Sequence, residues 1–529
     1  MRLFNVTGLC IPEEDYMVDI SEKIKKIKEL IDDRCYFTIN RARQYGKTTT
    51  LAKLERDLRN DYQTISISFE GLGDESFTTP DAFCAAFMEL IRRALQFTSA
   101  EEEYINAWFD VSVKDFISLH RHITKMCEGR KIVLMIDEVD KVSNNAVFLH
   151  FLSILRDKFL ARKRNVDYSF HSVILSGVYD IKNINLKMIN EGAYTPSIGE
   201  NKLYNSPWNI AADFEIDMSF SSSEIATMLR EYEADHNAGM DVAAIAGEIR
   251  AYTSGYPYLV SRICKHIDEK LDKNWTLNGV QEAVKIMLDE KNTLFDDIYK
   301  NLENNKDLYD FLYGLLVTGN GNGFNIYNPI IDLGYTYGFL RKGEQKKAVV
   351  SNRIFEILMY DYFISKDSIP KRRITGVIQR DVTDGGRFDM ELCLRKFTEH
   401  YAEIFSERDA EFIEREGRLL FLSYLKPLIN GQGFYHIESQ LTDMRRMDIV
   451  LDFSGEQFII ELKLWKGEAK HQKAYEQLVG YLGNKGFSTG YLLTFDFRKG
   501  ANKQQYAKWV NFGGKRIFDV VVNSPQDHR

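Results

Sequence analysis

Residues 35–58 read CYFTINRARQYGKTTTLAKLERDL, and this stretch decides the expected fold. Its first six residues form a short apolar segment that predicts a strand, and residues 50–58 have the apolar spacing of a helix. Between them lie Gly46, Lys47 and Thr48, in the order of a phosphate-binding loop. In such a loop the backbone N–H groups face the phosphates, Lys47 reaches the outer phosphates and Thr48 ligates Mg²⁺. Gly46, Lys47, Thr48 and Thr49 are therefore the candidate nucleotide-binding residues.

Two later segments fit the same parallel sheet. The apolar run 132–136 is typical of a strand buried on both faces, and it ends in Asp137-Glu138. This order resembles a Walker B element, in which Asp137 holds Mg²⁺ through water and Glu138 polarises the water that attacks the γ-phosphate. A third strand is expected at residues 172–175, and Ser176 follows it as a candidate sensor residue.

Each of these signals has a simpler explanation when it is taken alone. Gly-Lys-Thr also occurs by chance, and an apolar strand that ends in Asp-Glu can be a buried strand that meets solvent. Arg41 occupies the position of the usual first loop glycine, which leaves the path of the loop and the tightness of nucleotide binding open. The order of the motifs, each on its own strand, favours a P-loop ATPase core at residues 1–215.

The N-terminal opening supports a family resemblance. Residues 4–12, FNVTGLCIP, and Tyr16 to Val18 resemble the opening of bacterial AAA-like P-loop ATPases of the STAND group. The resemblance implies ATP and Mg²⁺ as cofactors and places this segment near the nucleotide base. Residues 221–273 read as helices and contain Gly255-Tyr256-Pro257, similar to the Gly-x-Pro element of the STAND lid, here expected at residues 216–295. Arg262 is a candidate second sensor, with an ordinary exposed helical arginine as the alternative.

A third module is expected at residues 296–367. Residues 305–317 have a helical period, residues 338–351 read as a β-hairpin, and residues 353–363 form a further helix. Helices followed by a hairpin suggest a winged helix, the usual third module of STAND proteins. Such a module binds DNA or relays movement, and its few basic residues favour the relay.

The most informative C-terminal segment is a predicted hairpin. Residues 447–453 alternate in polarity, turn at Ser454-Gly455 and return as residues 457–463. A two-residue loop puts Asp448 directly opposite Glu461. The alternation places Asp448, Glu461 and Lys463 on one face, because successive side chains of a strand point to opposite faces.

This pairing implies a metal ion. Opposed residues of a hairpin have Cβ atoms roughly 5 Å apart, so two carboxylates would repel each other unless a cation lay between them. Carboxylate oxygens suit hard ions such as Mg²⁺ or Mn²⁺. A metal-bound water can act as the nucleophile that hydrolyses a phosphodiester, with Lys463 to position it or to stabilise charge.

The hairpin resembles the core of the PD-(D/E)XK nuclease superfamily, which carries Asp and then Glu-x-Lys. In a predicted helix at residues 473–482, Gln477 and Tyr481 lie one turn apart, similar to the Gln-x-x-x-Tyr element of exonuclease-type members. The family also places an acid on a preceding helix, for which Glu416 is the candidate metal ligand and Glu414 its rival. The alternative is an amphipathic hairpin whose polar face is merely solvated.

The composition bounds the class of protein. At 529 residues the chain is expected to form several domains, and its 44% hydrophobic content supplies a large core. A net charge of −8 excludes a basic nucleic-acid wrapper. The six cysteines lack zinc or disulfide spacing, which predicts a reducing cytoplasm. With no signal peptide and no apolar run of roughly 20 residues, no membrane association is expected.

The sequence thus predicts a multidomain α/β protein, with a parallel-sheet P-loop core, a helical lid, a winged helix and a C-terminal mixed α/β domain like restriction endonucleases. Residues 368–387 are the expected linker and residues 388–529 the nuclease-like domain. The expected function is ATP hydrolysis coupled to metal-dependent cleavage of nucleic acid, DNA being favoured over RNA, in defence against foreign DNA. The alternative is a signalling or scaffold ATPase that binds DNA or protein without cutting. Both a monomer and a homo-oligomer are compatible with the sequence.

Overall fold

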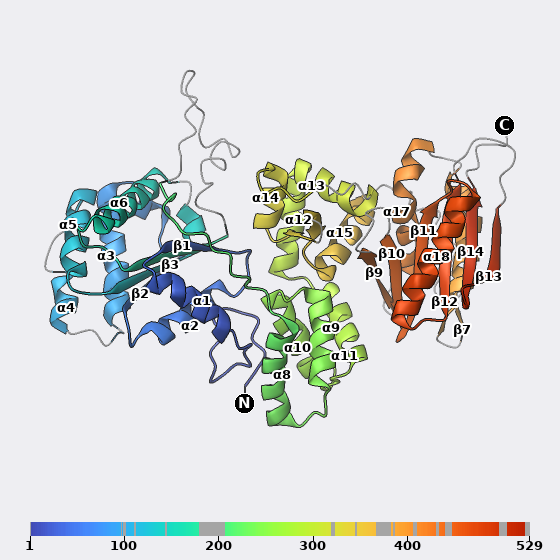
Figure 1. The fold of residues 1–529 in the computed structure, drawn as a ribbon, viewed down its shortest axis with the longest axis horizontal. Helices are drawn as coiled ribbons and strands as arrows, with labels where there is room; N and C mark the ends of the chain where they lie inside the picture. Colours follow the sequence, from blue (N-terminus) through green and yellow to red (C-terminus); the bar gives the residue numbers. More distant parts are fainter. Residues whose placement is uncertain are drawn as a thin grey trace, which may run out of the picture. The chain divides into compact units, whose positions relative to one another are not determined.

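The structure is a computed structural model that describes residues 2–96, 98, 102–109, 113–142, 145–178, 207–318, 323–343, 346–366, 382–384, 387–405, 410–429, 433–439, 447–496 and 505–523. The chain forms two compact units (Figure 1). Unit 1 comprises Met1–Arg250, Gly255–Lys265 and Thr336–Gly338, and unit 2 comprises Ala251–Ser254, His266–Tyr335 and Phe339–Arg529. This division is coarser than the five predicted segments, whose boundaries stay a prediction.

The centre of unit 1 is a four-stranded parallel sheet in the order β1-β4-β3-β2. Its strands are β1 (Tyr36–Asn40), β2 (Gln63–Ser68), β3 (Ile132–Asp137) and β4 (Ser172–Gly177). Every residue of β3 and β4 is buried, as expected for apolar strands covered by helices on both faces. The parallel P-loop sheet predicted from the sequence is thereby confirmed.

Helices lie on both sides of this sheet (Figure 1). They are α1 (Ser21–Asp32), α2 (Lys47–Leu58), α3 (Pro80–Gln96), α4 (Glu102–Ala107), α5 (Phe116–Cys127) and α6 (Ala146–Lys163), with short 3₁₀ turns at Asp74–Phe77 and Val139–Val142. A large aromatic cluster fills the core under α3, α5 and α6, and it includes Phe83, Phe87, Trp108 and Phe151. The helix α2 follows β1 directly, so the loop between them lies at the carboxyl edge of the sheet.

The expected lid region consists of four helices. They are α8 (Ser222–His236), α9 (Val242–Thr253), α10 (Pro257–Lys270) and α11 (Leu277–Leu288). The turn before α10 requires glycine, because Gly255 has φ 74° and an added Cβ would lie 2.0 Å from the carbonyl oxygen of Phe220. The predicted Gly-Tyr-Pro element therefore fixes how α10 starts against the segment that leads into α8.

The helix α11 belongs to unit 2, and further helices follow it there. They are α12 (Thr293–Asn304), α13 (Lys306–Tyr313), a π-helical turn at Gly314–Thr318 and α14 (Pro329–Thr336), whose last residue belongs to unit 1. The predicted hairpin is present as β5 (Leu340–Lys342) and β6 (Ala348–Val350), and α15 (Arg353–Lys366) follows it. These elements occur in the order expected of a winged helix, an interpretation that stays a prediction.

The C-terminal part of unit 2 contains a six-stranded mixed sheet in the order β13-β14-β12-β11-β10-β9. Its strands are β9 (Gly433–Ser439), β10 (Met447–Phe453), β11 (Glu456–Leu464), β12 (Thr489–Asp496), β13 (Tyr506–Phe512) and β14 (Lys515–Asn523), and its helices are α16 (Met390–Phe405), α17 (Ala410–Ile429) and α18 (Glu468–Lys485). A small hairpin, β7 (Thr383–Asp384) and β8 (Arg387–Phe388), precedes α16 at the end of the predicted linker. Most of that linker, residues 368–381, lies outside the described residues.

The predicted register of the C-terminal hairpin is confirmed. Asp448 pairs with Glu461, and Phe453 pairs with Glu456 beside the turn. Ser454 and Gly455 have φ of 50° and 85°, the left-handed values that a two-residue turn of this kind requires. The helix α18 covers the face of Val450 and Ile459, which is also the face on which residues 448 and 461 lie.

The described helices include none that is both long and apolar enough to cross a membrane.

Candidate functional site

The phosphate loop occupies residues 41–46, between β1 and α2. Gly46 caps α2 in a left-handed conformation, with φ 75°, and its carbonyl oxygen accepts from the N–H of Thr50 at 2.9 Å. The first turn of α2 therefore starts at Lys47, which presents the N-terminus of the helix at the end of the loop. Free N–H groups at such a terminus bind phosphate oxygens.

Lys47 folds back over the loop. Its side chain is buried, and Nζ donates to the carbonyl oxygens of Arg41 at 3.0 Å and Ala42 at 3.2 Å. Burial lowers the pKa of Lys47, while the nearby carboxylates of Asp140 and Glu138 oppose that change. The acceptors of this buried ammonium are uncharged carbonyl oxygens. The anionic oxygens of a phosphate ligand can take their place.

Asp137 is held by three donors at the end of β3. Thr48 Oγ1 donates to Asp137 Oδ2 at 2.7 Å, and Ser176 Oγ donates to Asp137 Oδ1 at 2.6 Å. The backbone N–H of Glu138 also donates to Oδ1, at 3.0 Å. The structure thus brings together Thr48 and Asp137, the two predicted Mg²⁺ ligands, and places the candidate sensor Ser176 beside them.

Glu138 leaves the line of the strand. Its φ of 55° is uncommon for a residue with a side chain, and it turns the chain sharply after β3. Burial raises the pKa of the Glu138 carboxyl, with further contributions from Asp137 and Asp140. A carboxyl with a raised pKa is suited to accept a proton from water.

Arg41, which replaces the usual loop glycine, directs its side chain out of the loop. Its guanidinium donates to the carbonyl oxygens of Asn40 at 2.7 Å and Ile216 at 2.6 Å, and it lies 5.3 Å from the ring centre of Phe214. The loop path is therefore compatible with an arginine at this position. The effect of Arg41 on nucleotide affinity stays open.

A cavity of about 370 Å³ adjoins the loop within unit 1. Residues 44–46 of the loop, with Thr49 and Thr50, line one side. Thr49 Oγ1 accepts from the N–H of Cys10 at 3.3 Å. Small-molecule pockets are roughly 300–1,000 Å³ in volume, so the cavity can hold a nucleoside. The remaining walls come from two groups of residues: the opening segment at residues 5–8, 10, 16–18 and 20, and the lid residues Met218, Phe220, Met228, Pro257, Tyr258 and Ser261.

The lid also touches the loop through Tyr256, a residue whose contact the sequence did not predict. Its hydroxyl donates to the carbonyl oxygen of Arg43, and its ring lies 4.7 Å from that of Tyr45. Asp140 was missed as well. It accepts from the N–H of Val178 and lies where a side chain at Gly177 would clash. Arg262 lies in α10, and its role as a second sensor stays a prediction.

Comparison with known proteins agrees with this geometry. A family model described as AAA-like domain matches residues 16–317. The chain belongs to the AAA-like domain family. This membership, with the loop, makes it a P-loop ATPase that binds ATP, and the family usually binds Mg²⁺ with the nucleotide. Among curated proteins no sequence matches the chain.

Solved structures similar to this AAA-like protein include three at low sequence identity. A Walker-type ATPase of Pyrococcus abyssi is 12% identical, with a TM-score of 0.45, and the match covers 67% of this chain and 99% of that one. A RuvB mutant of Thermotoga maritima is 13% identical, with a TM-score of 0.33 and coverages of 63% and 92%. The ADP form of the Aeropyrum pernix ORC2 protein is 12% identical, with a TM-score of 0.35 and coverages of 67% and 95%.

The second candidate site lies on the β10–β11 hairpin of unit 2. Glu461 is 1% exposed, and its Oε1 forms an ion pair with Nζ of Lys463. Asp452 on the same face is also buried, and its Oδ1 accepts from Gln457. The alternative of a merely solvated polar face is therefore wrong for this hairpin, because α18 covers it.

The prediction for this site also included Asp448, Glu416 and Gln477. The side chains of Asp448 and of Glu416, in α17, lie outside the described part of the structure, so their metal-binding roles stay predictions. Gln477 is half-buried on α18, whereas Tyr481 is buried in the cluster that packs α18 on the sheet. Among the described residues no group of three or more His, Cys, Asp or Glu side chains is arranged to hold a metal ion.

Further polar side chains lie on the covered face, from strands that the sequence did not predict. Thr494 pairs in register with Lys463, is fully buried, and has no hydrogen-bond partner for Oγ1 among the described residues. Asp519 on β14 accepts from Tyr475 at 2.6 Å and lies 3.0 Å from Nε2 of His471. This last group attaches α18 to the sheet and thereby fixes the helix that carries Gln477.

Proposed function

We propose that this AAA-like ATPase is of the STAND type and controls a C-terminal metal-dependent nuclease of the PD-(D/E)XK type. The observation that carries the proposal is the direct pairing of Asp448 with the buried Glu461, which forms an ion pair with the partly exposed Lys463. A buried carboxylate is costly unless it is paired, so its presence on this face indicates a role beyond solubility.

In the ATPase site, each residue has one task. Lys47 exchanges its loop carbonyls for the outer phosphates of ATP, while Thr48 and Asp137 hold the metal position. Bound Mg²⁺ would supply charge neutralisation for the phosphates. Glu138 accepts the proton of the attacking water, and Ser176 keeps Asp137 oriented through its hydrogen bond.

In the C-terminal site, Asp448 and Glu461 would hold Mg²⁺ or Mn²⁺, with Glu416 as a further candidate ligand. The metal would supply a more acidic water as the nucleophile. Lys463 neutralises charge on the scissile phosphate once Glu461 turns to the metal. Gln477, from α18, contacts the nucleic acid beside the cleaved bond, and DNA is the favoured substrate.

The remaining modules complete the proposal. Residues 216–295 act as the lid and residues 296–367 as a winged helix that relays the nucleotide state to residues 388–529, past the segment 368–387. By analogy with STAND proteins, we place this activity in the cytoplasm, in defence against foreign DNA. The proposal is compatible with a monomer and with a homo-oligomer.

The test is a cleavage assay on linear, circular and single-stranded DNA and on RNA, with Mg²⁺ or Mn²⁺ and with or without ATP. We expect cleavage by the wild type, and its loss in Asp448→Ala and Lys463→Ala while ATP binding persists. If the wild type leaves every substrate intact under all of these conditions, the nuclease part of the proposal fails.

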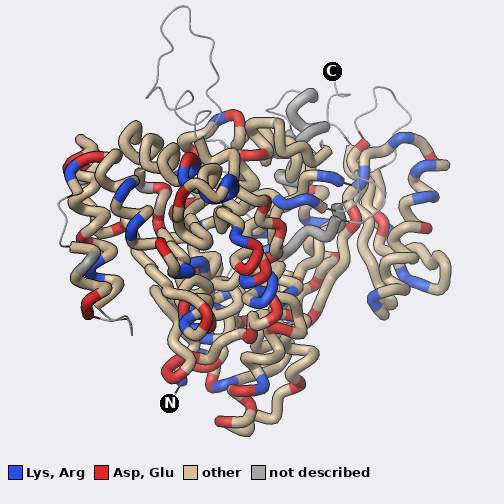
Figure 2. Tube along the Cα trace, turned by 60° about the vertical axis from the view of Figure 1, so that its left-hand side comes forward, with Lys and Arg blue, Asp and Glu red and all other residues tan. Residues whose placement is uncertain are grey.

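A second candidate function is a signalling or scaffold ATPase that binds DNA or protein without cutting. Arg41 in the place of the usual loop glycine favours it. Figure 2 shows acidic and basic residues interspersed along the trace rather than gathered by sign, a distribution that does not separate the two candidates. Under this alternative, Asp448→Ala would leave every measurable activity of the protein unchanged, including ATP-dependent partner binding.

A further inference from the structure

The N-terminal strap, defined here as residues 2–23, forms one wall of the nucleotide cavity. Asn5 to Gly8 and Tyr16 to Val18 line the cavity, together with Ile20. Phe220 and Met228 of the lid line it from the adjoining side. The cavity therefore keeps its shape only while the strap stays against the start of α8.

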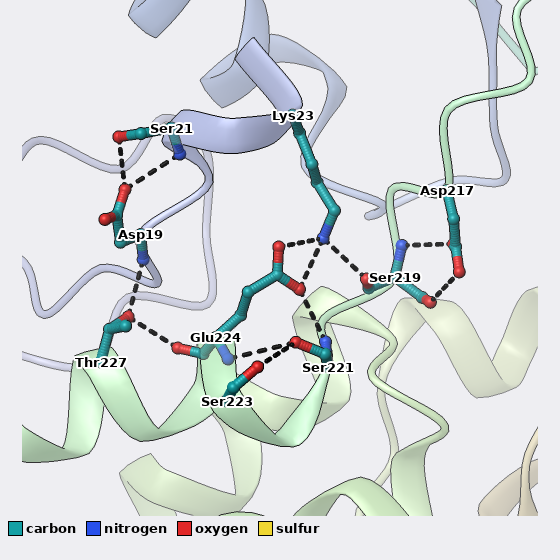
Figure 3. A network of polar contacts seen from close by, with 9 residues as sticks. All are labelled: Asp19, Ser21, Lys23, Asp217, Ser219, Ser221, Ser223, Glu224 and Thr227. Carbon is teal, nitrogen blue, oxygen red and sulfur yellow. Dashed lines mark hydrogen bonds and ion pairs between the residues drawn. The ribbon is translucent and has the colours of Figure 1, made fainter. Parts of the chain in front are cut away.

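The strap is attached along one face of α8. The backbone N–H of Asp19 donates to Thr227 Oγ1 at 2.9 Å, and the hydroxyl of Tyr16 donates to Asp235 at 2.9 Å (Figure 3 shows the first of these). Arg2 also donates to Asp235, at 2.9 Å. Arg2 also forms an ion pair with Glu231. Thr227, Glu231 and Asp235 are spaced by four residues, so they lie on one face of α8.

The most buried attachment is the ion pair between Lys23, in the first turn of α1, and Glu224. Lys23 Nζ lies 2.7 Å from Glu224 Oε1, and it donates to Oε2 and to the carbonyl oxygen of Ser219, both at 2.8 Å (Figure 3). The side chains are 11% and 21% exposed. The ammonium thus has two hydrogen-bond acceptors and a further ion-pair contact with Oε1.

Glu224 has a second task in the same network. Its Oε2 accepts from the backbone N–H of Ser221, and Ser221 Oγ accepts from the N–H of Glu224, which makes a capping box at the start of α8. The ammonium of Lys23 also lies 5.6 Å from the ring centre of Phe220, a residue of the cavity wall. The pair therefore connects α1, the cap of α8 and the cavity.

We infer that Lys23 and Glu224 are positioning residues for nucleotide binding, because they hold the strap and α8 together as one preformed wall around the nucleoside. Preformed walls strengthen binding by removing the ordering cost, and their loss is expressed mainly in the dissociation rate. This inference rests on the proposed placement of the nucleoside in the cavity.

The test measures nucleotide dissociation from the full chain. Methylanthraniloyl-ADP bound in the presence of Mg²⁺ is chased with excess ATP in a stopped-flow instrument. We expect Lys23→Met and Glu224→Gln each to raise the dissociation rate about tenfold. The double variant should be no faster than the faster single variant, since both remove the same interaction. Lys23→Arg, which keeps the charge, should restore most of the wild-type rate.

A structural role alone would not produce this pattern. The rate of a single turnover of bound ATP should stay unchanged, because neither residue contacts Thr48, Asp137 or Glu138. Lys28→Met is the matched control: Lys28 lies on the same helix and pairs with Asp61 at 2.8 Å, away from α8. Its dissociation rate should equal that of the wild type.

The possible outcomes distinguish failure of the positioning role from failure of the proposed nucleotide site. If the wild type binds the nucleotide and both pair variants release it at the wild-type rate, the positioning role is refuted. A wild type that binds no nucleotide overturns the proposed site and this inference together. Glu224→Gln is isosteric and keeps an acceptor for the cap, so it decides the matter even where Lys23→Met does not fold.

Discussion

Single residues carry the evidence for the nucleotide site. Lys47, Thr48 and Asp137 were expected from motifs. The structure brings Thr48 and Ser176 to the carboxylate of Asp137, while Lys47 binds carbonyl oxygens of its own loop. Arg41 was the exception to the motif, and its side chain binds carbonyl oxygens outside the loop. An arginine is thus tolerated in place of the loop glycine because its side chain forms hydrogen bonds outside the loop.

Replacing Lys47 by alanine should weaken binding of ATP with Mg²⁺ by about 1.5–3 kcal/mol, the contribution of hydrogen bonds to a charged group. Titration calorimetry measures the change. Lys53→Ala serves as the control, because Lys53 lies on the same helix and forms an exposed pair with Asp57 at 3.8 Å. Equal affinity of both variants would argue against a phosphate contact by Lys47.

His171 should make the protein less stable in acid. Its pKa is lowered to about 4, mainly by burial and then by the charges of Arg34, Arg162 and Lys131. Between the ordinary value of about 6.5 and about 4, the unfolded chain binds a proton that the folded chain excludes, so stability falls as the pH falls through this window.

His171→Phe keeps the ring beside Tyr62 and removes the titration. The melting temperature of this variant should fall less between pH 6.5 and pH 4 than that of the wild type. His150→Phe, at an exposed position on α6, should follow the wild type across the same range. Identical pH profiles for wild type and His171→Phe would show that another group governs acid stability.

At the scale of elements, glycines decide where helices start. Gly255→Ala should destabilise unit 1 by about 3 kcal/mol, since its Cβ would meet Phe220 backbone atoms and its φ is positive. Thermal unfolding of the full chain measures this, and nucleotide affinity should fall as α10 shifts from the cavity. In contrast, Gly247→Ala in α9 has open space around the added Cβ, and it should be neutral or stabilising.

The elements that sequence predicted best are those defined by local pattern. Three strands of the ATPase sheet and the register of Asp448 with Glu461 followed from apolar runs and from a two-residue turn. Thr494 and Asp519 were not found, because they join the site through parallel pairing with strands distant in sequence. The burial of Glu461 was also unexpected, since the covering helix α18 is not evident from the hairpin itself.

At the scale of the whole molecule, the nucleotide site and the proposed nuclease site lie in different units. All the residues of the nucleotide site lie in unit 1, and the carboxylate pair lies in unit 2. ATP with Mg²⁺ at about 100 times its dissociation constant should therefore stabilise unit 1 by about 2.7 kcal/mol. In differential scanning calorimetry, we expect the transition of unit 1 to move upward.

Lys47→Ala should lose that upward movement, whereas Asp448→Ala should keep it. Mn²⁺ without nucleotide should act on the other transition, and Asp448→Ala should remove this second effect. A single transition that responds equally to both ligands would mean that the units unfold as one cooperative body.

The ammonium of Lys47 has two carbonyl acceptors within its own loop. A ligand therefore gains only the difference between its own oxygens and those of the backbone. One phosphate oxygen improves little on that internal pair, while a chain of phosphates offers several anionic oxygens at once. We therefore expect the protein to bind ADP and ATP but not AMP.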